Sequence, residues 1–166
     1  MKLRSLTLVA VLIALSAVGA AVTIPGVLGT PALDSLPGFV AGFVLGAAPG
    51  AAVGALGHLF TAGLHGFPLS LPIHLTIAVE MAAIVASGAW ARRRFGWVAA
   101  SLWSIFANGV LAPALFLPWP GFGTAFFVAV VPQMIVASAI NVIIAAAVGK
   151  ALFATGAAAP FVSEQG

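Results

Sequence analysis

Long apolar runs with very few charges dominate this chain and restrict it to one broad class of structure. Hydrophobic residues occupy 63% of the 166 positions, and charged residues only 5%. A soluble domain of this size carries about 25% charged residues, because its surface must be wettable. The mean hydropathy of +1.23 therefore predicts an all-α integral membrane protein that sits in the lipid bilayer.

The same composition excludes several classes of function. No stretch is polar enough to form a separate soluble domain, so a nucleotide-binding or catalytic module is not expected. The six Lys and Arg residues are scattered, and we interpret them as topology signals rather than as a nucleic-acid surface. The absence of cysteine excludes disulfides, thiol catalysis and thiolate metal sites.

Proline and glycine clusters divide the chain into six predicted transmembrane helices in a single domain, residues 1–166. Each span needs about 20 apolar residues. A tight turn at GAAPG (46–50) separates two short helices, and the three arginines at 92–94 separate two longer ones. The predicted helices cover residues 5–24, 38–47, 49–63, 73–91, 97–117 and 122–153.

The positions of the cations predict the orientation of these helices. Lys2 and Arg4 precede the first helix, Arg92–Arg94 join the fourth to the fifth, and Lys150 closes the sixth. Six helices place all of these cations on one face, and the positive-inside rule makes that face cytoplasmic, together with both termini. In an alternative interpretation residues 1–20 are a cleaved signal peptide, which would leave five helices and an external N-terminus.

Polar residues recur at helical spacing on four of the predicted helices, forming one narrow stripe on each. Such residues are costly in lipid and tend to face the interior of the bundle, where they can line a hydrated pocket. The alternative is ordinary interhelical hydrogen bonding, typically worth about 0.6 kcal/mol each. We assign Ser and Thr to hydrogen bonding, and Asn108, Asn141 and Glu80 to a pocket. The stripes are Gly54, His58 and Thr61; Thr76, Glu80, Ala83 and Ser87; Ser101, Ser104 and Asn108; and Gln133, Ala137 and Asn141.

All three histidines lie near the predicted outer mouth of this pocket. The separations between His58, His65 and His74 are seven and nine residues, which match no metal-ligand motif, so no metal site is predicted. Glu80 has no Lys or Arg at its depth, and its carboxylate would need His58, His74, backbone donors or a ligand. Aromatic residues are expected to complete the wall and to suit a flat, neutral, partly polar small molecule. They are Phe39, Phe43, Phe67, Trp119, Phe122 and Phe126.

Small residues at four-residue spacing predict close approach of helices. Gly42, Gly46, Gly50 and Gly54 favour packing within the molecule. The Ala10-x-x-x-Ala14 pattern of the first helix fits either internal packing or contact with a partner subunit.

In these features the whole chain resembles the S component, the substrate-binding subunit, of energy-coupling factor (ECF) vitamin transporters. The six short spans, the Ala-x-x-x-Ala helix and the long, proline- and glycine-rich outer loop at residues 25–38 carry the resemblance. More specific phrases resemble the branch assigned to the cobalamin precursor α-ribazole, the CblT type. They are LDSLPGFVAGFVLG (33–46), GAAVGALGHLFTAGLHGFPL (50–69), LPIHLTIAVEMA (71–82), FANG (106–109) and ASAIN (137–141).

The resemblance implies a non-enzymatic transport subunit in the plasma membrane of a prokaryote, with no cofactor of its own. It would capture a vitamin-like molecule outside and deliver it inside with a T component and two cytosolic ATPases. Ala10 and Ala14 would dock the T component, and residues 25–38 would form a lid that Asp34 anchors, unless Asp34 only caps the second helix. The chain starts Met-Lys-Leu-Arg, whereas nickel and cobalt S components start Met-His, which argues against metal transport.

The resemblance also implies roles for individual side chains toward α-ribazole. Asn108, Asn141 and Glu80 would meet the ribose hydroxyls or the ring nitrogen. His58 and His74 would add hydrogen bonds at the rim. The remaining candidates are Phe39, Phe67 and Trp119, which would stack on or close over the ring, and Gln133 on the polar stripe.

Three alternatives stay open at the level of the sequence. The ligand could be another vitamin, such as cobalamin, riboflavin or folate. An intramembrane enzyme would need a Ser/His pair, paired acids or an HExxH metal site, and none is present. A purely structural membrane subunit would leave the polar stripes and the outer histidines without a role.

Overall fold

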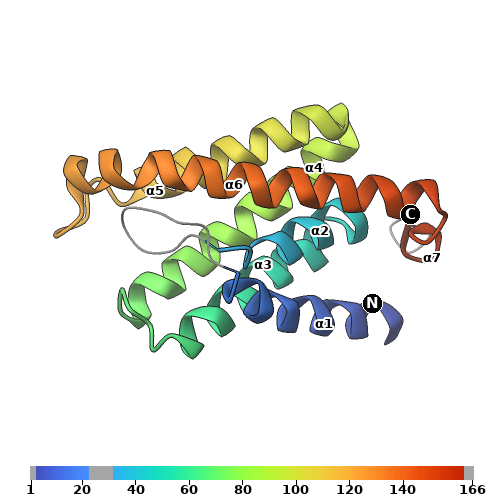
Figure 1. Cartoon of the computed structure of the whole chain (residues 1–166), viewed down its shortest axis with the longest axis horizontal. Helices are drawn as coiled ribbons and strands as arrows, with labels where there is room; N and C mark the ends of the chain where they lie inside the picture. Colours follow the sequence, from blue (N-terminus) through green and yellow to red (C-terminus); the bar gives the residue numbers. More distant parts are fainter. Residues whose placement is uncertain (1–2, 23–31, 163–166) are drawn as a thin grey trace.

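The computed structural model describes residues 3–22 and 32–162 of the chain, and these residues form helices joined by short connections. Successive long helical segments run in alternating directions along the length of the molecule (Figure 1). The part of the predicted lid within residues 25–31 lies outside the described residues. The helices are α1 (Leu3–Ala20), α2 (Leu36–Leu45), α3 (Ala47–Leu64), α4 (Leu71–Phe106), the π-helical turn η1 (Ala107–Leu111), α5 (Ala112–Leu115), α6 (Gly123–Ala154) and α7 (Ala159–Val162).

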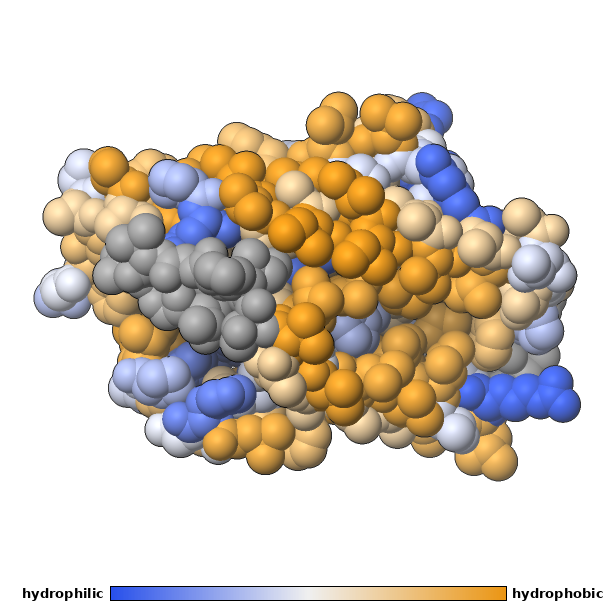
Figure 2. Space-filling model, in the orientation of Figure 1, coloured by the Kyte–Doolittle hydropathy of each residue, from blue (hydrophilic) through white to orange (hydrophobic). Residues whose placement is uncertain are grey.

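Four helical segments within the described residues are long and apolar enough to cross a membrane, which agrees with the predicted all-α membrane protein. They are α1, α3, the stretch Leu71–Leu115 and α6. The visible face of the molecule is mostly hydrophobic, with the hydrophilic residues mainly toward its ends (Figure 2). Helix α2 has ten residues and is shorter than a full span. The count of six spans and the cytoplasmic termini therefore stay predictions.

The breaks between helices depend on glycines with backbone angles that other residues avoid. Gly46 (φ 97°, ψ −175°) ends α2 and begins α3, within the predicted GAAPG turn. The predicted connection between residues 91 and 97 contains the break observed inside α4, at Gly96 (φ 87°, ψ −175°), but its three arginines, Arg92–Arg94, are helical. Arginine is a good helix former, so three arginines do not stop a helix, whereas glycine at this position lets the chain reverse.

Glycines also set the distance between α2, α3 and α4. A Cβ atom on Gly50 would lie 2.5 Å from Cα of Gly42, and one on Gly42 would lie 2.7 Å from Cγ1 of Val85. A Cβ atom on Gly54 would lie 3.1 Å from the carbonyl oxygen of Met81. The predicted packing role of these glycines is therefore confirmed, with Gly46 as the exception because it forms the break.

The two ends of the molecule differ in character. Helix α3 ends, and α4 and α6 begin, at the end that carries residues 65–70 and 116–122 (Figure 1). At the other end the guanidinium carbon of Arg92 lies 5.2 Å from the ring centroids of both Trp97 and Phe153.

Candidate functional site

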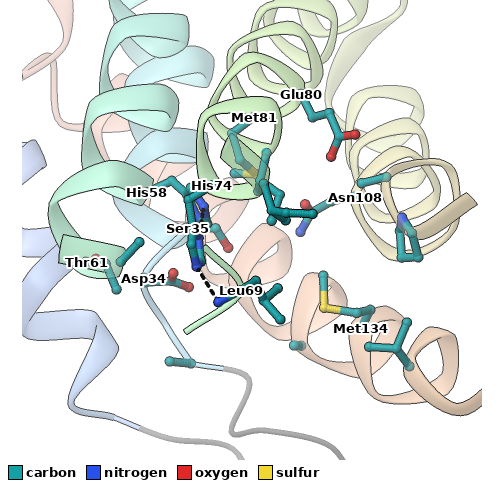
Figure 3. Close-up of a pocket in the computed structure, with 18 of the residues that line it drawn as sticks. Asp34, Ser35, His58, Thr61, Leu69, His74, Glu80, Met81, Asn108 and Met134 are labelled. Atoms are coloured by element: carbon teal, nitrogen blue, oxygen red, sulfur yellow. Dashed lines mark hydrogen bonds between the residues drawn. The ribbon is translucent and has the colours of Figure 1, made fainter. Parts of the chain in front are cut away.

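A cavity of about 510 Å³ opens between α3, the first half of α4, the η1–α5 segment and α6. Its lining also includes Ala20 at the end of α1 and the segment before α2. Figure 3 shows side chains from these elements pointing into a common space. A volume of this size is typical of small-molecule binding sites.

The polar stripes of α3 and α6 run along this cavity in full. Each residue of both stripes belongs to the lining: Gly54, His58 and Thr61 on α3, and Gln133, Ala137 and Asn141 on α6. The stripe on the first half of α4 contributes Glu80 alone. Thr76 and Ser87 lie outside the lining and bond the carbonyls of Pro72 and Ile84. The stripe that follows Gly96 contributes Asn108.

His58 and His74 lie against each other in the cavity lining. Nε2 of His58 is 3.1 Å from Nδ1 of His74, and the ring centroids are 5.2 Å apart. The backbone N–H of Leu69 donates to Nε2 of His74 over 3.3 Å, a bond drawn in Figure 3. Among the described residues, no group of three or more His, Cys, Asp or Glu side chains is arranged to hold a metal ion.

The connection between α3 and α4 has an unusual backbone that brings Leu69 to His74. Phe67 (φ 52°) and Ser70 (φ 79°) adopt positive φ values, which are uncommon for residues with a side chain. The N–H of Phe67 donates to the carbonyl of Ala62, and that of Ser70 to the carbonyl of Phe67, both over 2.8 Å. These bonds hold the strained conformation at the rim of the cavity.

The two asparagines are held by the protein through their amide nitrogens. Nδ2 of Asn108 donates to Oγ of Ser138 over 2.9 Å, which joins η1 to α6. Nδ2 of Asn141 donates to the carbonyl oxygens of Ala32 and Ala137, both over 2.9 Å. Asn141 thereby holds the segment before α2 against α6.

The aromatic candidates are placed differently from the prediction. Phe39 is 0% exposed and packs in the hydrophobic core with Phe43, away from the cavity lining. Phe67 contacts the ring of His74, and Trp119 contacts the ring of Phe116, both without lining the cavity themselves. The aromatic lining consists of Phe116, Phe122 and Phe126. Phe122 and Phe126 belong to the predicted aromatic wall, and Phe116 was missed.

Asp34 is a second residue that the sequence interpretation did not place in the lining. The N-cap of α2 is Ser35, not Asp34, and no side chain caps the helix. Asp34 instead lines the cavity, where burial raises the pKa of its carboxyl group from 3.8 to about 6. Backbone N–H groups and His65 act in the opposite direction and limit the shift.

Comparison with known protein families identifies a family that matches most of the chain. The family described as ECF transporter, substrate-specific component, matches residues 4–153, which include every residue that lines the cavity. No curated protein and no solved structure matches the chain.

Proposed function

Because the chain belongs to the family of ECF transporter substrate-specific components, we propose that the cavity is the binding site for its transported ligand, a small vitamin-like molecule with α-ribazole as the first candidate. Membership of the family makes the chain a substrate-binding transport subunit rather than an enzyme. The observation that carries the proposal is the cavity itself, into which separate helices direct Glu80, His58, Asn108 and Asn141.

The size and chemistry of the cavity support α-ribazole over the larger alternatives. A volume of about 510 Å³ suits a benzimidazole joined to one ribose and is too small for cobalamin. The rings of Phe116, Phe122 and Phe126 offer apolar surface for the flat base. The amides and the carboxyl group offer hydrogen bonds to the ribose hydroxyls.

The test is a calorimetric titration of the detergent-purified chain with α-ribazole, riboflavin, folate, biotin, thiamine, cobalamin and Ni²⁺. We expect sub-micromolar binding of α-ribazole that is lost in Asn108→Ala and in Glu80→Ala. Thr76→Val is the matched control, since Thr76 lies one turn before Glu80 outside the lining. Binding of a different vitamin would replace α-ribazole, and no binding by folded protein would reject the cavity as a ligand site.

The proposal includes a T component and two ATPases as partners, docked through α1. Ala10 and Ala14 are exposed, while the buried face of α1 carries Val9, Leu12 and Ser16. Small residues on an exposed helix face permit close approach of another helix. The double variant Ala10→Trp, Ala14→Trp should keep ligand binding and lose co-purification with the T component; retained co-purification would reject α1 as the docking helix.

A further inference from the structure

Buried polar atoms without partners are concentrated at the cavity. Six buried side-chain nitrogen and oxygen atoms lack a hydrogen-bond partner within the described part of the chain. Four of them belong to cavity-lining residues: Oγ1 of Thr61, Oε1 and Oε2 of Glu80, and Oδ1 of Asn141. Nearly all buried polar groups in folded proteins are paired, because an unpaired one is costly. These oxygens are therefore the candidate hydrogen-bonding atoms for a ligand in the cavity.

At least two of these four atoms can only accept hydrogen bonds: one carboxyl oxygen of Glu80, in either protonation state, and Oδ1 of Asn141. The side chain of Glu80 is only 8% exposed. Asn141 is 1% exposed, and its orientation is fixed because its amide nitrogen faces two carbonyl oxygens that require N–H donors. Its Oδ1 is thus the atom left for the ligand. Of the four atoms, the hydroxyl of Thr61 can donate as well as accept.

The charged groups around the cavity also disfavour an anionic ligand. Its titratable lining groups are Asp34, Glu80, His58, His65 and His74. The described cations, Arg4, Arg92–Arg94 and Lys150, all lie outside the lining. A carboxylate or phosphate placed here would lose its hydration, find no Lys or Arg, and lie near two carboxyl groups.

From these observations we infer that the cavity selects a ligand that carries N–H or O–H donors and no negative charge, with Glu80 and Asn141 as the selecting acceptors. This inference rests on the proposed function and deepens it by naming the class of substrate. It favours neutral and cationic molecules over folate, biotin and any phosphorylated vitamin.

The test is calorimetry on the full chain at pH 7.5 with pairs of probes that differ in charge. The pairs are α-ribazole and its 5′-phosphate, riboflavin and its 5′-phosphate, thiamine and its monophosphate, nicotinamide and nicotinate, and biotinamide and biotin. We expect at least one neutral or cationic probe to bind, and its anionic counterpart to bind about tenfold more weakly or worse, a difference of about 1.4 kcal/mol. The last two pairs have nearly equal size, so they separate charge from steric exclusion.

Glu80→Gln supplies the second readout. Removing the carboxyl group should weaken binding of the preferred probe. It should also bring the ratio of affinities for the uncharged and the anionic probe toward one, whereas steric exclusion would leave this ratio unchanged. Thr76→Val on the same helix should preserve the wild-type ratio. If Glu80→Gln does not fold, the ratio in the wild-type chain still decides.

The outcomes separate this inference from the proposed function. An anionic probe that binds as tightly as its counterpart overturns the inference and leaves the cavity a transport site. Failure of α-ribazole alongside binding of another uncharged probe removes the proposed ligand and supports the inference. Failure of every neutral and cationic probe overturns both.

Discussion

Nε2 of His58 lies 3.1 Å from Nδ1 of His74, and this hydrogen bond joins α3 to the start of α4. The hydrogen-bond network fixes its direction. Because Nε2 of His74 accepts from the N–H of Leu69, the proton of His74 is on Nδ1 and is donated to His58. Nε2 of His58 then accepts, which leaves the Nδ1–H of His58 as a donor. The two rings and the α3–α4 connection thus form one continuous chain of hydrogen bonds.

Replacing the middle member of this chain should destabilise the protein. His74→Ala leaves the N–H of Leu69 and the ring of His58 without a partner, and should cost about 1–3 kcal/mol. The measurement is thermal unfolding of the purified protein in detergent. His65→Ala is the control and should cost less, since His65 is exposed and its ring bonds the carbonyl of Thr61, four residues earlier in the chain. Equal losses in the two variants would argue against a linked pair.

Asp34 should make stability depend on pH. Its folded pKa of about 6 exceeds the ordinary value of 3.8, so its contribution is fully favourable below about pH 4 and is lost as the pH rises through about 6. Asp34→Asn should therefore match the wild type at pH 4 and be the more stable protein at pH 7.5. The upper limit is about 3 kcal/mol, and partial exposure reduces it. Thermal unfolding of both proteins from pH 4 to 8 measures the difference, and a variant that is less stable at pH 7.5 would reverse the sign.

Two glycines of α3 should respond in opposite directions to the same substitution. Gly50→Ala places a methyl group 2.5 Å from Cα of Gly42, a backbone atom that cannot move aside, and should cost about 1–3 kcal/mol. Gly63→Ala meets its nearest atom, on the ring of Phe67, at 3.5 Å and should gain up to about 1 kcal/mol from helix propensity. Melting temperatures of the two variants provide the comparison. A stable Gly50→Ala protein would contradict the close packing of α2 on α3.

The amide of Asn141 should be required as a donor. Asn141→Asp keeps the shape of the side chain but offers no N–H to the carbonyls of Ala32 and Ala137, and should cost about 1–3 kcal/mol for each lost bond. Thr155→Val, which removes an exposed hydroxyl bonded to the last turn of α6, should change stability by no more than about 0.5 kcal/mol. Thermal unfolding distinguishes the two. An Asn141→Asp protein as stable as the wild type would mean that the amide is oriented the other way.

The chain has no cysteine, so single cysteines can report which side of the membrane each end faces. Pro120→Cys, between α5 and α6, should react with a membrane-impermeant maleimide in intact cells. Ala157→Cys, just after α6, should react only after lysis. Both positions are exposed, and the unmodified chain gives the background. Labelling of Ala157→Cys in intact cells would reject the predicted cytoplasmic C-terminus.

The fold was largely predictable because membrane helices depend on local features that a sequence displays directly. Apolar length and glycine or proline clusters predicted helical segments that differ from the observed ones by a few residues at most ends. The break at Gly96 lies inside the predicted connection of residues 92–96, but the helix was predicted to end before Arg92, because charge was used to place a break that depends on backbone freedom. Charge records the side of the membrane, and only the glycine has access to the required φ angle.

The polar residues of the cavity lining could be predicted from the sequence, but the aromatic ones could not. Glu80, His58, Asn108, Asn141 and Gln133 line one cavity because a polar side chain in lipid has few other places to go. An aromatic residue is stable against a ligand, a core or another ring, so hydrophobicity alone could not separate Phe39 from Phe116. Asp34 was missed because its position before α2 also fits an N-cap.

The first residues of α1 and the end of α7 both lie at the end of the molecule away from the connections 65–70 and 116–122 (Figure 1). A tether attached at either terminus is therefore remote from residues 65–70, which contribute His65, Pro68 and Leu69 to the cavity lining. The protein can be immobilised on a sensor surface in two independent ways, and association and dissociation rates that agree between them will be free of artefacts from the attachment.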